Sequence, residues 1–464
     1  MVLSKFMSEP EKTQSLRPLR WKDIYREAEL YRAAVRVFTK PLFQWRKALS
    51  TSTDGRTLYD FAAQGLRRLD ALHSALRQEV FEFRPATALH YNFNGKHRTL
   101  YIFPWEERIV DLLLYRLLNR RLHHWFSPNS YAYRQPGFGL DCCQKRIAAY
   151  IRRQKAPIFL IKRDISDYFA AIRHDRLLEQ IASLVDPSDY LYRLLDQRVR
   201  FLFVDEGELG RASIGIPFGA AVACLFANLF LTATDRELES LADTTFFRYA
   251  DDILILSPNR HSAERAGKQL ESSLAELGLK TKASHQANLV ISAKAIADSF
   301  FQPAKQFRHL GLLFRTDGMV SLSRDKLRKI QNLFRFGFRR GRRRWERKRD
   351  PTEQTQALLD IAMEVIEKGI RNVAILDYYL KHVNDENQLR LLDRWLAEEV
   401  LSRVFGGHKK GHFRRIGFRQ LREMGLPCMV HRRRLIQRGE IESPFFIWQR
   451  EKATRALRGT VARQ

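Results

Sequence analysis

One stretch, residues 246–256, constrains the fold of this chain more than any other. It reads Phe-Phe-Arg-Tyr-Ala-Asp-Asp-Ile-Leu-Ile-Leu, so the adjacent aspartates Asp251 and Asp252 lie between two runs of apolar and β-prone residues. The pattern predicts a β-hairpin with both carboxylates at its bend. Two carboxylates held this close raise each other's pKa unless a cation binds them. The stretch therefore favours a metal site over its alternative, a plain acidic turn.

A second acidic strand end lies upstream. A short apolar run leads to Asp164 and a helical pattern follows, so we expect Asp164 at the tip of a buried strand. If that strand lies beside the hairpin, Asp164, Asp251 and Asp252 converge. Three carboxylates suit Mg²⁺, and two such ions about 3.5–4 Å apart can activate an attacking 3′-oxygen and stabilise a leaving pyrophosphate. The predicted chemistry is nucleotidyl transfer with two Mg²⁺ ions.

Composition points to a polyanionic partner. The 464 residues suffice for about three domain-sized units. Because 81 Lys and Arg outnumber 52 Asp and Glu, the net charge is +29, and aromatic residues are plentiful. We therefore expect a folded nucleic-acid-binding protein. The four cysteines have neither disulfide nor zinc-ligand spacing, and no apolar run could span a membrane, so we expect a cytoplasmic protein without membrane contact.

Five motifs resemble those of reverse transcriptases in their order and spacing. The resemblance covers roughly residues 80–325 and is closest to bacterial enzymes of the defence-associated and unknown groups, which are related to group II intron and retron enzymes. The motifs are Asp164-Ile165-x-x-Tyr168-Phe169, Gly215-Ile216-Pro217-Phe218-Gly219, Tyr249-Ala250-Asp251-Asp252, Leu277-Gly278-Leu279 and His309-Leu310-Gly311.

The resemblance implies an α+β right-hand palm polymerase. Its expected parts are an N-terminal helical extension (1–80), fingers (81–156), a palm with an antiparallel sheet and some fingers elements (157–322), an α-helical thumb (323–405) and a basic C-terminal extension (406–464). Asp164, Asp251 and Asp252 are implied as catalytic and metal-binding residues, with the backbone carbonyl of Ile165 as a further ligand. Apolar spacing predicts helices over 21–49, 58–80, 104–124, 188–203, 220–238 and 259–276.

Expected nucleotide contacts surround the carboxylates. Phe169 matches the position that reverse transcriptases use as a steric gate against a 2′-hydroxyl, and its alternative is a core phenylalanine. A hairpin predicted over 81–103, with Asn94-Gly95 as its turn, carries Lys96 and Arg98, which either reach the triphosphate or lie in a solvated turn. The remaining residues implied by the resemblance are Arg108, Pro217 and Gly219 at the nucleotide, and Leu310 and Gly311 in a primer grip.

The chain departs from the family at two of these positions. Phe218 stands where most relatives have Gln, which replaces a side-chain hydrogen bond near the nucleotide by apolar or stacking contact. His285 stands where relatives usually have a lysine that protonates pyrophosphate. A histidine can also act as a general acid, although an exposed loop histidine is the alternative, and Lys280 and Lys282 compete for the role.

The most basic stretch, residues 334–349, is interleaved with aromatic residues. This combination suits phosphate neutralisation and stacking better than a solvated face. Helices expected near 352–369, 371–381 and 385–405 then resemble a thumb that clamps a template and primer. The predicted nucleic-acid contacts are Arg335, Arg339, Arg340, Arg342, Arg343, Arg344 and Trp345.

These features predict an RNA-directed DNA polymerase that copies an RNA template, expected to be a partner noncoding RNA, into cDNA. Its partners would be the RNA template, a DNA primer and deoxynucleotides, and the resemblance to defence-associated enzymes implies a role in antiphage defence. The alternatives are an intron maturase-like RNA-binding protein, a retron-type reverse transcriptase and a purely structural RNA-binding subunit. The presence of all three carboxylates disfavours the last.

Overall fold

The computed structural model describes residues 17–39, 44–93, 96–134, 138–154, 157–292, 294, 296–367, 376–377, 380 and 382–441. A five-stranded sheet lies at its centre, with strand order β6-β7-β3-β8-β9. All neighbours are antiparallel except β8 and β9. The strands are β3 (Ile158–Asp164), β6 (Thr245–Tyr249), β7 (Asp252–Ser257), β8 (Ala287–Ile291) and β9 (Gln302–Ala304).

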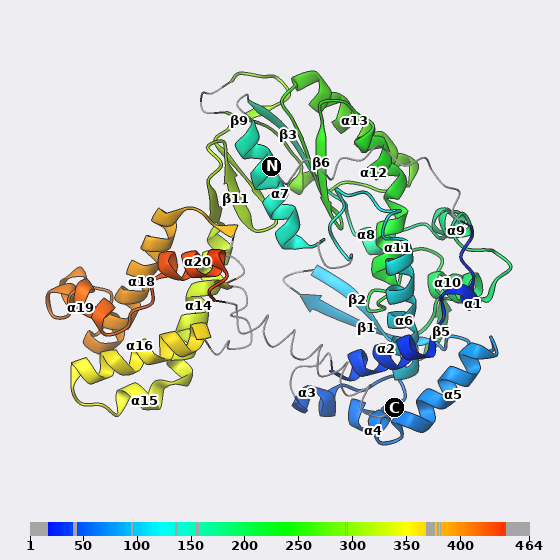
Figure 1. Ribbon diagram of the computed structural model, residues 1–464, viewed down its shortest axis with the longest axis horizontal. Helices are drawn as coiled ribbons and strands as arrows, with labels where there is room; N and C mark the ends of the chain where they lie inside the picture. Colours follow the sequence, from blue (N-terminus) through cyan, green and yellow to red (C-terminus); the bar gives the residue numbers. More distant parts are fainter. Residues whose placement is uncertain are drawn as a thin grey trace.

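This sheet separates two hydrophobic cores. On one face Ile161, Ile253 and Ile255 pack in the same cluster as α13 (Arg260–Glu276). On the other face the alternate strand residues share a cluster with α7 (Leu140–Arg153). Figure 1 shows both helices against the sheet. Because both faces are buried, the two central strands contain continuous apolar runs, at residues 158–161 in β3 and 253–256 in β7.

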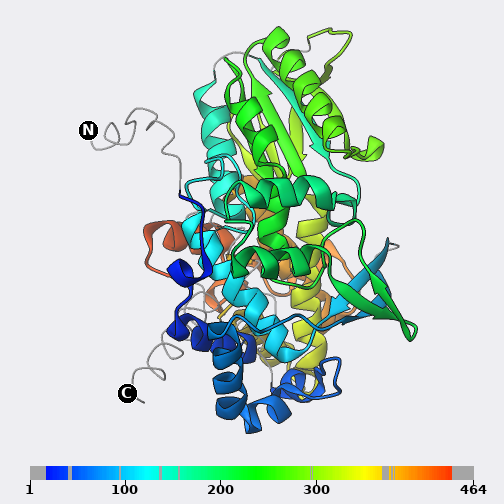
Figure 2. The ribbon, with the colours of Figure 1, turned by 90° about the vertical axis from the view of Figure 1, so that its right-hand side faces the viewer.

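A second sheet, of order β2-β1-β4-β5, extends from the body of the molecule, as Figure 2 shows. The predicted hairpin is confirmed, although its turn, Asn94-Gly95, lies outside the described residues. The Tyr101 amide donates to the Phe218 carbonyl at 2.9 Å, which ties this hairpin to the 215–219 motif. The strands are β1 (Ala86–Phe93), β2 (Lys96–Ile102), β4 (Leu202–Asp205) and β5 (Glu208–Arg211).

The N-terminal helices are shorter than their apolar spacing predicts. The helix expected over 21–49 is wrong as one element, because Tyr25 takes an extended conformation (ψ 135°) that ends its first turn. The helix expected over 58–80 is interrupted at Gln64. The elements here are α1 (Trp21–Ile24), α2 (Glu27–Thr39), α3 (Gln44–Leu49), α4 (Leu58–Ala63), α5 (Gly65–Arg77) and α6 (Trp105–Arg121).

Two further helices also differ from expectation. The helix predicted over 188–203 ends at Val199, since the chain enters β4 three residues later, at Leu202. The one predicted over 220–238 is interrupted near Leu231, where the Thr232 hydroxyl donates to the Asn228 carbonyl, a bond that competes with the helix backbone. The helices of this region are α8 (Tyr168–Ala171), α9 (His174–Ala182), α10 (Tyr190–Val199), α11 (Ala223–Phe230) and α12 (Thr232–Glu239).

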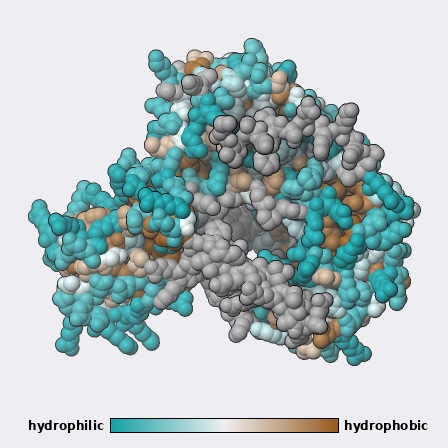
Figure 3. Space-filling view, in the orientation of Figure 1, coloured by the Kyte–Doolittle hydropathy of each residue, from teal (hydrophilic) through white to brown (hydrophobic). Residues whose placement is uncertain are grey.

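A three-stranded sheet leads into a separate group of helices, residues 324–441, which we call the helical lobe. It lies on the left in Figure 1, and Figure 3 shows mostly hydrophilic side chains on its visible face. The helix expected over 371–381 falls almost wholly outside the described residues, as do residues 442–464. The elements are β10 (Gln306–His309), β11 (Leu312–Arg315), β12 (Val320–Leu322), α14 (Arg324–Arg340), α15 (Arg342–Glu346), α16 (Pro351–Glu367), α18 (Glu386–Phe405), α19 (Phe418–Glu423) and α20 (Met429–Arg438).

None of the helices in the described ranges is long and apolar enough to cross a bilayer.

The contact between the β1–β2 hairpin and Gly219 is tight enough to test. Gly219 has φ +127°, and a Cβ there would lie 2.6 Å from the Tyr101 carbonyl oxygen. Gly207, in the β4–β5 turn, has φ +94° but open space around it. We expect Gly219→Ala to lower the free energy of unfolding by about 1–3 kcal/mol more than Gly207→Ala, because only the former adds a clash to the backbone strain. Urea denaturation of both variants measures the difference, and equal losses would contradict the packing.

Candidate active site

The three aspartates lie at one edge of the five-stranded sheet. Asp164, the last residue of β3, stands directly opposite Asp252, the first residue of β7. Asp251 precedes it in the β6–β7 turn, where Ala250 has φ +57°. The amide of Ile165 donates to the Asp251 carbonyl at 3.1 Å, which joins the end of β3 to this turn. The structure thus brings together Asp164, Ile165, Asp251 and Asp252.

A buried ion pair supports the β6–β7 turn. Arg248 in β6 is 1% exposed, and its Nε and Nη2 donate to the two carboxylate oxygens of Asp235 at 2.7 and 2.5 Å. Its Nη1 donates to the Ala250 carbonyl at 3.2 Å and to Asn228 at 3.3 Å. Such a bidentate pair fixes the orientation of the guanidinium group and also balances its buried charge. Sequence reasoning missed this support, although an arginine inside an apolar strand is itself a signal, because it requires a buried partner.

Burial disfavours the ionised forms of Asp251 and Asp252. It raises the pKa of Asp251, and the neighbouring Asp164 carboxylate raises it further. Burial, opposed by Lys162 and reinforced by the other two aspartates, raises the pKa of Asp252 to about 6. Lys282 lies 3.1 Å from Asp164, and Lys162 lies 3.7 Å from Asp252. Two ammonium groups therefore partly balance the acidic edge.

The donor set fits a hard divalent cation. Carboxylate oxygens are the ligands that Mg²⁺ prefers, and the buried Oδ1 of Asp252 makes no hydrogen bond in the described part of the chain. The Lys162 ammonium lies 3.7 Å from this oxygen, too far for a hydrogen bond, so a bound divalent cation would supply the close partner that the buried oxygen lacks. Within the same ranges, no three His, Cys, Asp or Glu side chains already stand in a metal-binding arrangement. To bind an ion, the aspartate carboxylates would need to rotate toward it, and the ammonium groups of Lys162 and Lys282 would need to move away from them.

Phe169, the expected steric gate, lies half-buried in a cluster of aromatic rings. Its ring centroid is 5.9 Å from that of Phe218 and 6.2 Å from that of Tyr133, both edge to face. The Arg98 guanidinium lies 6.0 Å from the centre of the Phe218 ring. Arg98 of the hairpin therefore lies next to Phe218, the residue that departs from the family, and Phe218 in turn contacts Phe169, the expected gate. The Lys96 side chain lies outside the described residues.

The 215–219 motif is fixed against α8 by its backbone. The Gly215 amide donates to the Ile172 carbonyl and the Ile216 amide to the Phe169 carbonyl, each at 2.8 Å. Pro217 is buried behind the half-buried Phe218. Gly215, with φ +82°, approaches the backbone of α8 too closely for a side chain. The motif therefore positions Phe218 beside Phe169.

Of the remaining residues predicted to contact the nucleotide, His285 lies near Asp164, whereas Arg108 does not contact the carboxylates in the described residues. His285 is exposed with its Nδ1 3.9 Å from Asp164, whereas the Lys282 ammonium is nearer at 3.1 Å, and Lys280 contributes a backbone carbonyl to Ser166. Arg108 lies over the Trp105 ring at 4.4 Å, and burial lowers its pKa. No described contact joins Arg108 to the carboxylates.

The expected primer grip is a strained turn beside the carboxylates. Leu310 has φ +49° and Gly311 φ +82°, and the Ser323 hydroxyl donates to the Gly311 carbonyl at 2.8 Å. The preceding residue, His309, is fully buried with its Nδ1 3.4 Å from Asp252 Oδ1. Burial lowers the pKa of His309 well below its usual range, so the ring is neutral. Sequence reasoning assigned this histidine to the motif but not to the neighbourhood of Asp252.

The basic stretch 334–349 is only partly available to a ligand. Trp345, predicted to stack on nucleic acid, is buried at 8% exposure and donates its indole N–H to the Phe338 carbonyl, so that prediction is wrong. It fails because the residue faces the core of the helical lobe. Arg335, Arg342 and Arg344 form ion pairs with glutamates. The predicted arginines that are exposed without a described ion pair are Arg339, Arg340 and Arg343.

The raised pKa of Asp252 has a measurable consequence for stability. A carboxyl whose pKa is raised by folding is favoured in its protonated form, so ionised Asp252 destabilises the fold as pH rises through about 6. Without divalent ions, we expect Asp252→Asn to be more stable than the parent by about 1–2 kcal/mol near about pH 7.5, with the gap shrinking toward about pH 4.5. Thermal unfolding across pH measures it.

The matched control is Asp243→Asn, since Asp243 is exposed at the other end of β6 and its carboxylate makes no described contact. A gain for Asp252→Asn that does not change with pH, or none at all, would contradict the electrostatic account.

Parts of the sequence match known proteins. Residues 106–314 match the family described as Reverse transcriptase (RNA-dependent DNA polymerase). The chain is 24% identical over 174 residues to the "Uncharacterized 91 kDa protein in cob intron" of Schizosaccharomyces pombe, covering 37% of this chain and 21% of that protein. It is 26% identical over 183 residues to the "Putative COX1/OXI3 intron 2 protein" of Saccharomyces cerevisiae, covering 38% and 20%. The chain thus matches about a fifth of the length of these relatives.

Among solved structures, apo telomerase from Candida tropicalis aligns with a TM-score of 0.43 and 11% identity, covering 74% of this chain and 69% of that one. Telomerase from Candida albicans, in complex with a fragment of telomeric RNA, aligns with a TM-score of 0.42 and 10% identity, covering 79% and 68%. The family match includes the stretch from β3 to β10 that carries the aspartates. Residues 106–314 thus resemble a reverse transcriptase domain, and the described residues there form a mixed α+β structure.

Proposed function

We propose that this protein is an RNA-directed DNA polymerase whose active site is formed by Asp164, Asp251 and Asp252. The observation that carries the proposal is the pairing of β3 with β7, which sets Asp164 opposite Asp252 inside the region that matches the reverse transcriptase family. Two Mg²⁺ ions bound there would activate the primer 3′-oxygen and neutralise the leaving pyrophosphate. Reverse transcriptase domains generally depend on divalent metal ions, and the orphaned Asp252 Oδ1 fits that requirement.

The residues around the carboxylates have separate tasks in this proposal. Asp164, Asp251, Asp252 and the Ile165 carbonyl hold the cations, while Phe169 lies under the sugar and leaves no room for a 2′-hydroxyl. Arg98, with Lys96 and Arg108, attracts the triphosphate, and the 215–219 motif seats the base beside Phe218. Lys282 is the nearer candidate for donating a proton to pyrophosphate, with His285 second.

The wider chain would then bind the template and primer. We propose residues 81–156 as fingers, 157–322 as palm, 323–405 as thumb, 1–80 as a helical extension and 406–464 as a basic extension. Leu310 and Gly311 would seat the primer end beside Asp252. Arg339, Arg340 and Arg343, which are exposed without described ion pairs, would neutralise backbone phosphates.

Removal of the paired aspartates tests the site. We expect Asp251→Ala plus Asp252→Ala to reduce extension of a DNA primer on an RNA template by about a thousandfold or more, because the cations lose most of their ligands. Asp243→Asn, in the same hairpin, should retain activity. Primer extension with circular dichroism as a check of folding measures both, and equal activity of the double variant and the parent would refute the assignment.

The steric gate is tested by sugar discrimination. Phe169→Val shortens the side chain that packs against Phe218 and Tyr133, and should lower the preference for deoxynucleotides over ribonucleotides by about 10–100-fold. Tyr133→Phe keeps the neighbouring ring and should leave the preference unchanged. The ratio of kcat/KM for dGTP and GTP is the readout, and an unaltered ratio in Phe169→Val would eliminate the gate.

The RNA that this polymerase would copy is a separate question. Both matched fungal proteins are named for introns, which favours an intron-associated enzyme or maturase-like RNA-binding protein as the second candidate. The unusual Phe218 supports instead the proposal of a bacterial, defence-associated enzyme that copies a noncoding RNA in the cytoplasm. Sequencing the nucleic acid that co-purifies with the protein separates them, since an intron supports one and a small noncoding RNA with its cDNA supports the other.

A further inference from the structure

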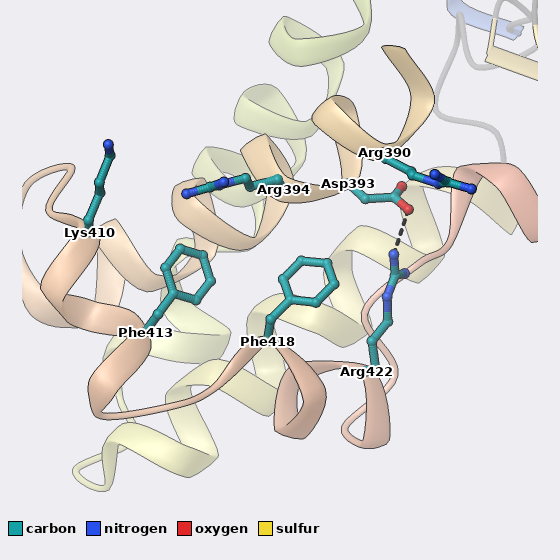
Figure 4. A pocket seen from close by; sticks show the side chains of 7 residues that line it. All are labelled: Arg390, Asp393, Arg394, Lys410, Phe413, Phe418 and Arg422. Carbon is teal, nitrogen blue, oxygen red and sulfur yellow. Dashed lines mark hydrogen bonds and ion pairs between the residues drawn. The ribbon is translucent and has the colours of Figure 1, made fainter. Parts of the chain in front are cut away.

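A cavity of about 560 Å³ opens in the helical lobe, between α18, the short helix η2 (Lys410–Arg414) and α19. Figure 4 shows two phenylalanine rings directed from η2 and α19 toward α18, with cationic side chains around them. None of the carboxylates of the candidate active site lines it. The cavity is therefore separate from the candidate active site.

The aromatic part of the cavity is formed by Phe413 and Phe418. Their ring centroids are 6.4 Å apart with an interplanar angle of 49°, so the two rings are tilted and not stacked on each other. Phe418 is 37% exposed, which is unusual for a large apolar side chain. The guanidinium of Arg422 lies 5.0 Å from the Phe418 ring centre and braces it from one side. A flat apolar ligand could contact both rings.

The charge around the cavity is positive. Its one lining carboxylate, Asp393, is 1% exposed and already accepts hydrogen bonds from Arg422 at 2.5 Å and from the Met429 amide at 2.9 Å. Among the described residues, Arg394 forms an ion pair with the carboxylate of Glu398 one helical turn away, and Lys410 has no described ion pair. Figure 4 places Arg394 and Lys410 at the same end of the cavity, next to Phe413. That end would attract an anion.

Aromatic faces next to cations are the elements with which proteins bind unpaired nucleotides. Stacking of one base on an aromatic side chain contributes about 1–3 kcal/mol, and arginine and lysine bind the adjoining phosphate. The volume lies in the range of ordinary ligand sites of about 300–1,000 Å³ and accommodates a nucleotide. A base in a duplex cannot enter, because it is paired and stacked on both sides. An acidic peptide would use the cations but not the two ring faces.

We propose that this cavity binds one unpaired nucleotide of a nucleic-acid strand, with its base against Phe413 and Phe418 and its phosphate at Arg394 and Lys410. The site would hold a single-stranded segment outside the catalytic centre, and it does not depend on the proposed polymerase activity. The strand is either the RNA template or a DNA strand, since both present the same base and phosphate.

Binding to labelled oligonucleotides tests the proposal. We expect Phe418→Leu to weaken binding of a single-stranded oligonucleotide by about tenfold at physiological salt, with little effect on a blunt duplex. Arg394→Gln plus Lys410→Gln should lower the slope of log K against log salt for the single strand by about 1.4. Fluorescence anisotropy with RNA, DNA of the same sequence, and duplex RNA measures these effects. A larger loss for RNA identifies the RNA strand, and a larger loss for DNA identifies the DNA strand.

Arg419→Gln is the charge-matched control, because Arg419 also lies on α19 but its side chain is 94% exposed and does not line the cavity. Unchanged affinity of Phe418→Leu for both single strands, or an equal loss for the duplex, would overturn the proposal. A measurement on the unaltered protein guards against misfolding of the variants: photocrosslinking of 4-thiouridine RNA and of 4-thiothymidine DNA should label the segment 410–422 with at least one strand, and crosslinks confined to other segments would contradict it.

Oligonucleotide binding by the cavity variants is measured without nucleotides, so it reports on strand binding independently of primer extension. Failure of this proposal and failure of the polymerase assignment are thus separable, because one alters strand binding and the other alters catalysis by Asp251 and Asp252.

Discussion

The pairing register between β3 and β7 is the constraint on which the rest of the structure depends. It sets Asp164 opposite Asp252, and a slip of one residue would separate these carboxylates and turn every strand side chain to the other face. The register is fixed because the two faces of the sheet belong to different cores. Ile161, Ile253 and Ile255 fit the core with α13, and their neighbours fit the core with α7. Ordinary apolar packing therefore determines the position of the acidic edge.

The acidic edge has an electrostatic cost that the protein offsets from several directions. Burial disfavours the ionised forms of Asp251 and Asp252, while Lys162 and Lys282 supply opposite charge. The Arg248–Asp235 pair fixes the turn without approaching the carboxylates as a competing ligand. Such an electrostatic cost is typical of functional sites, where activity is gained at the expense of stability. Neutral His309 beside Asp252 adds no further charge and links the Leu310-Gly311 turn to the same edge.

Much of this arrangement could be predicted from local sequence pattern. Both aspartate-bearing strand ends and the hairpin of residues 86–102 follow from apolar runs and turn residues close together in the chain. The interruption at Tyr25 could not be predicted, because spacing alone does not reveal that the residue is extended. The partner of Arg248 could not be identified because several acidic residues were possible. Trp345 was misassigned because a basic, aromatic-rich helix has the same composition whether its rings face solvent or core.

In the proposed mechanism, these strand ends hold two divalent cations against an incoming nucleotide. The most direct measurement is an experimental structure with an RNA template, a dideoxy-terminated DNA primer, a deoxynucleotide and Mn²⁺, with the ions located by anomalous scattering. We expect two manganese peaks bound by the carboxylates of Asp164 and of Asp251 or Asp252, with Lys282 displaced from Asp164. Nucleic acid and nucleotide bound elsewhere, with Lys282 still paired to Asp164 and no ion at this edge, would contradict this mechanism.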